Sequence, residues 1–179
     1  MVFGVILGTG VGAGIAWNGE VWTGAQHIAG EWGHHCIDPA GPPCYCGQRG
    51  CAEVYLSGPA LEGSYADAGG ARSSVQEIAM RRDGGEGIAI RVIDSYLGRF
   101  GRALANVINI LDPGVVVLGG GLSNLPFLYD AGRDAVASRV FNDELRTPIL
   151  RNQLGDSAGV LGAALLAAEP GATLDPSAW

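Results

Sequence analysis

One short segment places the strongest constraint on this chain. Residues 30–53 read GEWGHHCIDPAGPPCYCGQRGCAE and contain all four cysteines and two of the three histidines. Frequent glycine and proline residues prevent a long helix or strand here. A loop of this kind has little apolar core of its own. We therefore expect another interaction, supplied by its cysteine and histidine side chains, to hold it in shape.

Composition excludes two classes of partner. The chain has 179 residues and a net charge of -7, and Arg81-Arg82 is its single basic doublet, whereas a nucleic-acid surface needs clustered positive charge. Its apolar runs are short and broken by glycine, and its first residues lack the basic region of a signal peptide. With 47% hydrophobic residues, it is predicted to be a packed, soluble, cytoplasmic protein without nucleic-acid or membrane partners.

The cysteine spacing indicates a metal site. In a cytoplasmic chain, closely spaced cysteines favour metal binding over a disulfide framework. Three thiolates and an imidazole are the closed tetrahedral donor set of structural Zn²⁺. Reduced thiols packed as small apolar groups, or disulfides, are the alternatives. Cys36 is left over and is assigned a structural role. The candidate ligands, in the pattern H-x9-C-x-C-x4-C, are His34, Cys44, Cys46 and Cys51.

The same segment contains carboxylates suited to binding a polar ligand. Glu31 stands three residues before His34, and Glu53 follows the last cysteine by two residues. An ionised carboxylate accepts several hydrogen bonds, so both glutamates could hold hydroxyl groups. The alternative is that they are solvated side chains. Because His34 and His35 are adjacent, only one is expected to be the metal ligand, and sequence position does not decide between them.

The order of expected elements is that of an α/β protein. Residues 2–7 predict a buried strand, and Asn18-Gly19 predicts a hairpin turn. Apolar residues at three- and four-residue steps predict a long helix over residues 86–111, ended by Asp112-Pro113. The remaining expected elements are a short helix from 51 stopped at Gly58-Pro59, a linker over 63–76, a short helix near 75–82, a central strand within 114–121 covered on both faces, a helix near 126–141, a strand within 148–154, a helix over 158–168 and a tail over 169–179.

Two glycine-rich turns are candidate nucleotide contacts. The first, GTGVGAG, follows the opening strand and leads into a hairpin, so it indicates a phosphate-binding β-turn and not a Rossmann turn, which a helix must follow. The alternative is a tight turn that needs only small residues. The second turn, residues 119–121, follows the central strand, where α/β sheets bind ligands.

Four motifs together resemble the ROK family of sugar kinases and repressors. They are LGTGVGAG, GEWGH, CYCGQRGCAE with the YLSG that follows, and INILDPGVVVLGGGLSN. The resemblance extends from residue 5 to about residue 167. It implies an α/β chain with an actin-like ATPase (ribonuclease H-like) fold, of which residues 1–168 form the large carboxyl-terminal lobe of a two-lobed sugar kinase.

The resemblance also implies roles for particular residues. The family's zinc ligands correspond to His34, Cys44, Cys46 and Cys51. Its sugar-hydroxyl contacts correspond to Glu31, His34 and Glu53. Its ATP contacts correspond to Thr9 and Gly10 on the phosphate side, and to Gly119, Gly120 and Gly121 on the adenosine side. Structural Zn²⁺, ATP and Mg²⁺ are the implied cofactors.

One departure from the family pattern affects the expected activity. Family kinases carry an amino-terminal lobe with a DxGGT phosphate loop and an Asp that acts as general base, and neither is in this sequence. We therefore expect a kinase for a hexose or amino-hexose, of the fructokinase, glucokinase or N-acetylglucosamine kinase type, that is inactive as this chain alone. The alternatives are a fragment of a sugar-responsive repressor and a binding-only sugar module. The family also implies a homodimer.

Overall fold

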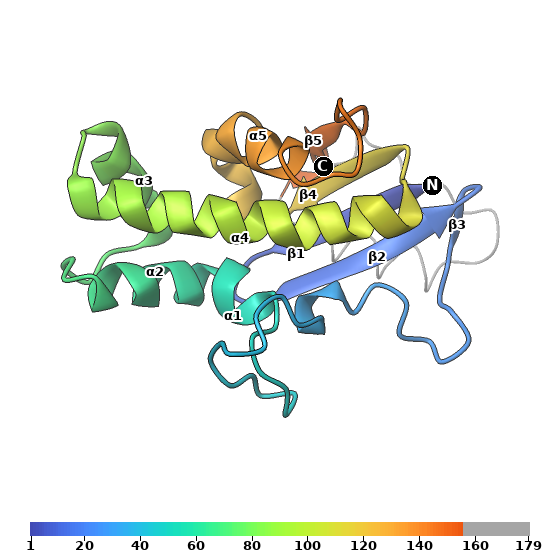
Figure 1. The fold of residues 1–179 in the computed structure, drawn as a ribbon, viewed down its shortest axis with the longest axis horizontal. Coiled ribbons are helices and arrows are strands. Elements are labelled where there is room, and N and C mark those ends of the chain that lie inside the picture. The colour runs from blue at the N-terminus through green and yellow to red at the C-terminus, as the bar shows by residue number, and fades with distance from the viewer. Residues whose placement is uncertain (156–179) are drawn as a thin grey trace.

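The computed structural model describes residues 1–155, which form one mixed sheet and the helices packed on it (Figure 1). The strands are β1 (Val2–Leu7), β2 (Val11–Trp17), β3 (Glu20–Val21), β4 (Val115–Gly119) and β5 (Ile149–Arg151). The helices are α1 (Glu53–Leu56), α2 (Gly58–Asp67), α3 (Val75–Asp83), α4 (Gly87–Leu111) and α5 (Ala131–Ala137). Short 3-10 turns are η1 (Trp32–His34), η2 (Gly121–Asn124) and η3 (Pro126–Leu128). The predicted helix over 158–168 and tail over 169–179 lie outside the described residues.

The sheet topology brings the two glycine motifs together at the carboxyl ends of neighbouring strands. The strand order is β3-β2-β1-β4-β5, with β1 antiparallel to β2 and parallel to β4. β1 and β4 are parallel neighbours, with Ile6 beside Gly119, so their carboxyl ends lie side by side. Ligands of α/β proteins bind outside such carboxyl ends. The fold thus places the turn after β1 next to the glycines after β4.

The predicted hairpin between β2 and β3 is confirmed. Asn18 and Gly19 have φ of 53° and 83°, the left-handed values that a type I′ turn requires at both central positions. Trp17 pairs with Glu20 across the turn. The Asn-Gly pair thus sets the register of this edge of the sheet.

The long predicted helix is also confirmed and forms much of the core. α4 lies across the strands in Figure 1 and ends at Leu111, with Asp112 in a left-handed conformation at its cap. Residues at the predicted three- and four-residue steps are buried, except Leu111 at the helix end, which is half-buried; the buried ones include Ile93, Leu97, Phe100, Leu104 and Ile108. Each such side chain contributes about 1.5–3 kcal/mol through burial. No helix in residues 1–155 combines the length and apolar character that a bilayer span needs.

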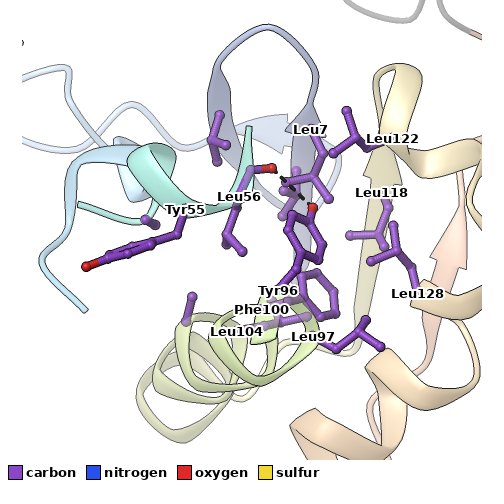
Figure 2. Packing of buried hydrophobic residues seen from close by; sticks show 14 of the residues in the cluster. Leu7, Tyr55, Leu56, Tyr96, Leu97, Phe100, Leu104, Leu118, Leu122 and Leu128 are labelled. Atoms are coloured by element: carbon purple, nitrogen blue, oxygen red, sulfur yellow. Dashed lines mark hydrogen bonds between the residues drawn. The ribbon is translucent and has the colours of Figure 1, made fainter. Parts of the chain in front are cut away.

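One buried polar group joins α4 to the next layer. Tyr96 is 2% exposed, and its hydroxyl donates a 3.1 Å hydrogen bond to the carbonyl oxygen of Leu56, at the end of α1 (Figure 2). A buried hydroxyl is costly without such a partner. This bond therefore fixes α1, which follows the cysteine loop, against the helix that fills the core.

The short helix predicted to end at Gly58-Pro59 is confirmed, because α1 ends at Leu56 and Ser57 is extended, but the sequence did not reveal that a second helix begins at Gly58 and Pro59. These two residues begin α2, and the predicted linker over 63–76 is helical as far as Asp67. Ser57 caps the helix, its side-chain oxygen accepting a hydrogen bond of 3.3 Å from the N–H of Ala60. Proline is well tolerated in a first helical turn, where the missing N–H has no intrahelical partner.

The helix predicted near 126–141 is shorter and interrupted. The chain forms η3 and then α5, with Asp130 between them at φ −104° and ψ −92°, a conformation outside the helical region.

The burial of the two faces of β4 also differs from the prediction. Within residues 1–155, Val116 and Leu118 are fully buried, whereas Val115 and Val117 on the other face are only half-buried.

Candidate functional site

The cysteine loop folds so that the four predicted metal ligands converge. The donor atoms of His34, Cys44, Cys46 and Cys51 all lie within 4.8 Å of one another. Cys44 Sγ is 3.6 Å from Nδ1 of His34, and Cys46 Sγ is 3.6 Å from Cys51 Sγ. In a tetrahedral zinc site with Zn–S bonds near 2.3 Å, neighbouring donors are about 3.8 Å apart. The four side chains thus fit a Zn²⁺ ion.

The geometry disfavours the two alternatives for these cysteines. All four thiols are free, and the 3.6 Å between Cys46 and Cys51 is far beyond a disulfide bond length. Cys46 is exposed, so it is not packed as a small apolar group. Cys36 is exposed outside the cluster, and its backbone pairs with Cys51 in an isolated bridge.

The structure separates the roles of the two adjacent histidines. His34 directs Nδ1 toward Cys44, and its Nε2 lies 2.9 Å from the hydroxyl of Tyr45. His35 stacks on the Trp32 ring and its Nδ1 lies 2.7 Å from the Trp32 carbonyl oxygen. His34 is therefore the histidine of the candidate metal cluster, whereas His35 packs against Trp32.

The two neighbouring thiols of Cys46 and Cys51 differ in proton affinity. Burial raises the pKa of Cys51 to about 12, and the hydrogen bond that its thiol donates to Cys46 adds to this effect. A backbone hydrogen bond at Gln48 lowers the pKa of Cys46. Because thiolates are the metal-binding form, metal binding must release the proton of Cys51.

Two glycines allow the loop to approach β2 closely, a role that the sequence did not reveal. A Cβ atom on Gly33 would lie 2.0 Å from the carbonyl oxygen of Val11. A Cβ on Gly30, whose φ is +100°, would lie 2.5 Å from the carbonyl oxygen of Ala13. These contacts set the position of Glu31, which lies between the two glycines and is exposed.

Glu53 joins the cysteine loop to the turn after β1. It is the first residue of α1 and is half-buried, and its Oε2 accepts a 2.9 Å hydrogen bond from the N–H of Val11. A Cβ on Gly10 would lie 2.8 Å from that same oxygen. The predicted phosphate turn and a predicted sugar carboxylate are therefore in direct contact.

The second glycine motif packs against the end of β1. Gly120 has φ of +79°, and a Cβ there would lie 2.4 Å from the carbonyl oxygen of Leu7. Gly121 has nothing within 4 Å of its Cβ position, and Thr9 in the neighbouring turn is exposed. Exposed residues therefore lie in both turns, the one after β1 and the one after β4.

Comparison with known proteins identifies the family. The family model described as ROK family matches residues 1–170. The chain belongs to the ROK family. An N-acetyl-D-glucosamine kinase of Pasteurella multocida is 39% identical to it over 176 residues, which are 92% of this chain and 58% of that kinase. The chain therefore spans under two thirds of the length of this relative.

Solved ROK structures share the fold. A ROK hexokinase from Thermus thermophilus has a TM-score of 0.82 and 35% identity, over 92% of this chain and 57% of that one. A ROK family glucokinase from Streptomyces griseus, solved with glucose and AMPPNP, has a TM-score of 0.82 and 28% identity, over 92% and 59% of the two chains. The predicted actin-like ATPase fold of the ROK sugar kinases is thereby confirmed.

Proposed function

We propose that this chain is the large lobe of a cytoplasmic, ATP-dependent kinase that phosphorylates a hexose or amino-hexose. In this proposal residues 1–168 form the lobe, with the sugar loop at 30–53 and a tail at 169–179. The observation that carries it is the bond from Val11 N–H to Oε2 of Glu53, which joins the phosphate turn to the loop. Phosphoryl transfer depends on such positioning of donor and acceptor.

The sugar is held, in this proposal, by side chains of the cysteine loop. The carboxylates of Glu31 and Glu53 would accept hydrogen bonds from sugar hydroxyls, and His34 would contact the sugar through Nε2. In the structure Nε2 lies against the hydroxyl of Tyr45, which is 83% exposed and so is free to move. His34, Cys44, Cys46 and Cys51 would hold a structural Zn²⁺ that keeps the loop in shape.

The nucleotide would lie at the carboxyl ends of β1 and β4. Backbone N–H groups at Thr9 and Gly10 would face the phosphates of ATP bound with Mg²⁺, and residues 119–121 would border the adenosine. The close contact of Gly120 with Leu7 supports this assignment, since it brings the two glycine motifs together. The family resemblance assigns the general base to an Asp of an amino-terminal lobe outside these residues. We therefore expect this chain alone to bind sugar without turning over ATP.

N-acetylglucosamine is the first substrate to test, because N-acetylglucosamine kinases are among the relatives at 35–39% identity. Sugar-dependent ADP release would be measured for the chain alone and for the chain co-expressed with the part of the P. multocida kinase that it does not match. We expect turnover only in the co-expressed sample, and its loss in Glu53→Gln. Sugar binding without turnover in either sample would indicate a binding module, and absence of sugar binding would contradict the proposal.

The family resemblance also leads us to propose a homodimer. Sedimentation of the chain would give the mass of two copies. A mass of one copy at every concentration tested would contradict this part of the proposal.

A further inference from the structure

A basic pocket of about 310 Å³ lies between α4 and residues 37–38 of the cysteine loop. α4 passes between this loop and α5 in Figure 1. The polar residues that line the pocket are Asp38, Tyr55, Ser95, Arg99, Arg102 and Arg139. None of the residues assigned above to zinc, sugar or ATP lines it.

The pocket concentrates positive charge in an acidic protein. The chain has 18 acidic and 11 basic residues, all 11 of them arginines, and three of these face this one cavity beside a single carboxylate. The ion pairs described within residues 1–155 involve Arg81, Arg82 and Arg146, and none of the pocket arginines. An excess of guanidinium groups without carboxylate partners is the arrangement that binds a phosphate group.

The contacts of the arginines hold them in place and leave donors available. Arg99 stacks on the ring of Tyr55, with its guanidinium carbon 4.3 Å from the ring centre. Arg102 donates a 3.3 Å hydrogen bond to the carbonyl oxygen of Ile37 through one Nη. Arg139 donates through one Nη to the carbonyl oxygen of Ala135, at 2.8 Å, beside the end of α5. A guanidinium has five N–H donors, so each keeps donors for a ligand.

We propose that this arginine pocket binds a phosphate group carried by a small molecule, at a site separate from the sugar and ATP contacts. The guanidinium groups of Arg99, Arg102 and Arg139 bind the phosphate oxygens in bidentate fashion. Ser95 and Asp38 are placed to bind hydroxyl groups of an organic phosphate. The ligand is therefore either free phosphate or a phosphate monoester.

Residues that line the pocket are hydrogen-bonded to the cysteine loop. The hydroxyl of Tyr55 donates a 2.9 Å hydrogen bond to Asp38, which follows Ile37 in the loop. The N–H of Ile37 donates in turn to the carbonyl oxygen of Gly50, next to Cys51. Tyr55 also lies on α1 with Glu53, and Figure 2 shows its ring apart from the Tyr96 and Phe100 cluster. A phosphate held here would therefore lie against residues 37–38 of the proposed sugar loop.

The test uses the 179-residue chain without ATP or acceptor sugar, so its outcome does not depend on kinase activity. Inorganic phosphate and glucose 6-phosphate are titrated separately at constant low ionic strength, and arginine Nε–H signals are followed by NMR. Glucose is the control without a phosphate. We expect saturable binding that glucose does not displace. Tighter binding of glucose 6-phosphate assigns the site to an organic phosphate, and equal affinities assign it to the free ion.

Substitutions then locate the site. Arg99→Gln and Arg139→Gln lie on different elements, and each is expected to weaken phosphate binding by at least about tenfold, because charge-assisted hydrogen bonds are lost. Arg91→Gln, on the exposed side of α4, is the matched control and should bind as the wild type does. Circular dichroism confirms that each variant is folded. Absence of saturable binding by both phosphates, or unchanged affinity in the folded arginine variants, would overturn the proposal.

Discussion

The N–H of Val11 lies 2.9 Å from Oε2 of Glu53 and donates a hydrogen bond to it. These residues are 42 positions apart, one at the start of β2 and the other at the start of α1. The bond orients a carboxylate that is only half-buried, and so leaves its second oxygen available to a ligand. This one contact thus links the proposed phosphate turn to the proposed sugar loop.

Glu53→Gln should separate sugar binding from stability. An amide retains an oxygen for the Val11 N–H but loses the negative charge, so we expect a stability cost of about 1 kcal/mol and at least about a tenfold loss of sugar affinity. Calorimetric titration with N-acetylglucosamine and thermal unfolding measure the two effects. The control is Glu62→Gln, since Glu62 also accepts a backbone N–H, from Val75, away from the loop. Equal sugar affinity in the two variants would argue against a sugar contact at Glu53.

Gly120→Ala should be far more destabilising than Gly121→Ala. The first adds a Cβ 2.4 Å from the carbonyl oxygen of Leu7 at a φ of +79°, whereas the second adds one with nothing within 4 Å. We expect a loss of roughly 2–4 kcal/mol for Gly120→Ala and under about 0.5 kcal/mol for Gly121→Ala. Urea unfolding of both variants measures this, and similar midpoints would show that the close packing of the two glycine motifs is wrong.

Cys46→Ser should reduce both zinc content and stability. A serine hydroxyl is a poor substitute for a thiolate ligand, and structural zinc contributes directly to the free energy of folding, so a loss of several kcal/mol is expected. Elemental analysis and melting temperature are the measurements. Cys36→Ser is the control, because Cys36 is exposed and outside the cluster. If the two variants carried as much zinc as the wild type, Cys46 would not be a ligand.

Alkaline pH should destabilise the chain partly through Tyr96. Its burial raises its pKa above the ordinary value of 10.0, so above that pH the unfolded chain loses this proton while the folded chain keeps it. Stability should therefore fall as pH rises above 10, by about 1.4 kcal/mol per pH unit from this residue. Unfolding between pH 8 and 11 should show a shallower decline in Tyr96→Phe. An identical slope in the variant would exclude Tyr96 as a cause.

Local patterns in the sequence were sufficient for several elements. The Asn18-Gly19 turn, the apolar face of α4 and the spacing of the cysteines each depend on residues close together in the chain. The signals for the missed helix that begins at Gly58-Pro59 are also local. Proline stops a helix in its interior but favours its first turn, and the serine before the pair was the signal that decided between these roles.

Contacts between distant segments could not be predicted in this way. The choice of His34 over His35 depends on the approach of Cys44, ten positions along the chain, to Nδ1 of His34. The roles of Gly30 and Gly33 depend on carbonyl oxygens of β2, about 20 residues earlier in the chain. The arginine pocket likewise joins residues from the loop, α1, α4 and the end of α5, and no spacing in the sequence indicated it.

The most direct test of the account is titration of N-acetylglucosamine into the zinc-loaded chain and into the same chain after zinc removal with a chelator. The account predicts saturable binding to the loaded chain, at least about tenfold weaker binding after zinc removal, and recovery when Zn²⁺ is added back. Absence of binding to the loaded chain, or the same affinity with and without zinc, would contradict a metal-held sugar loop.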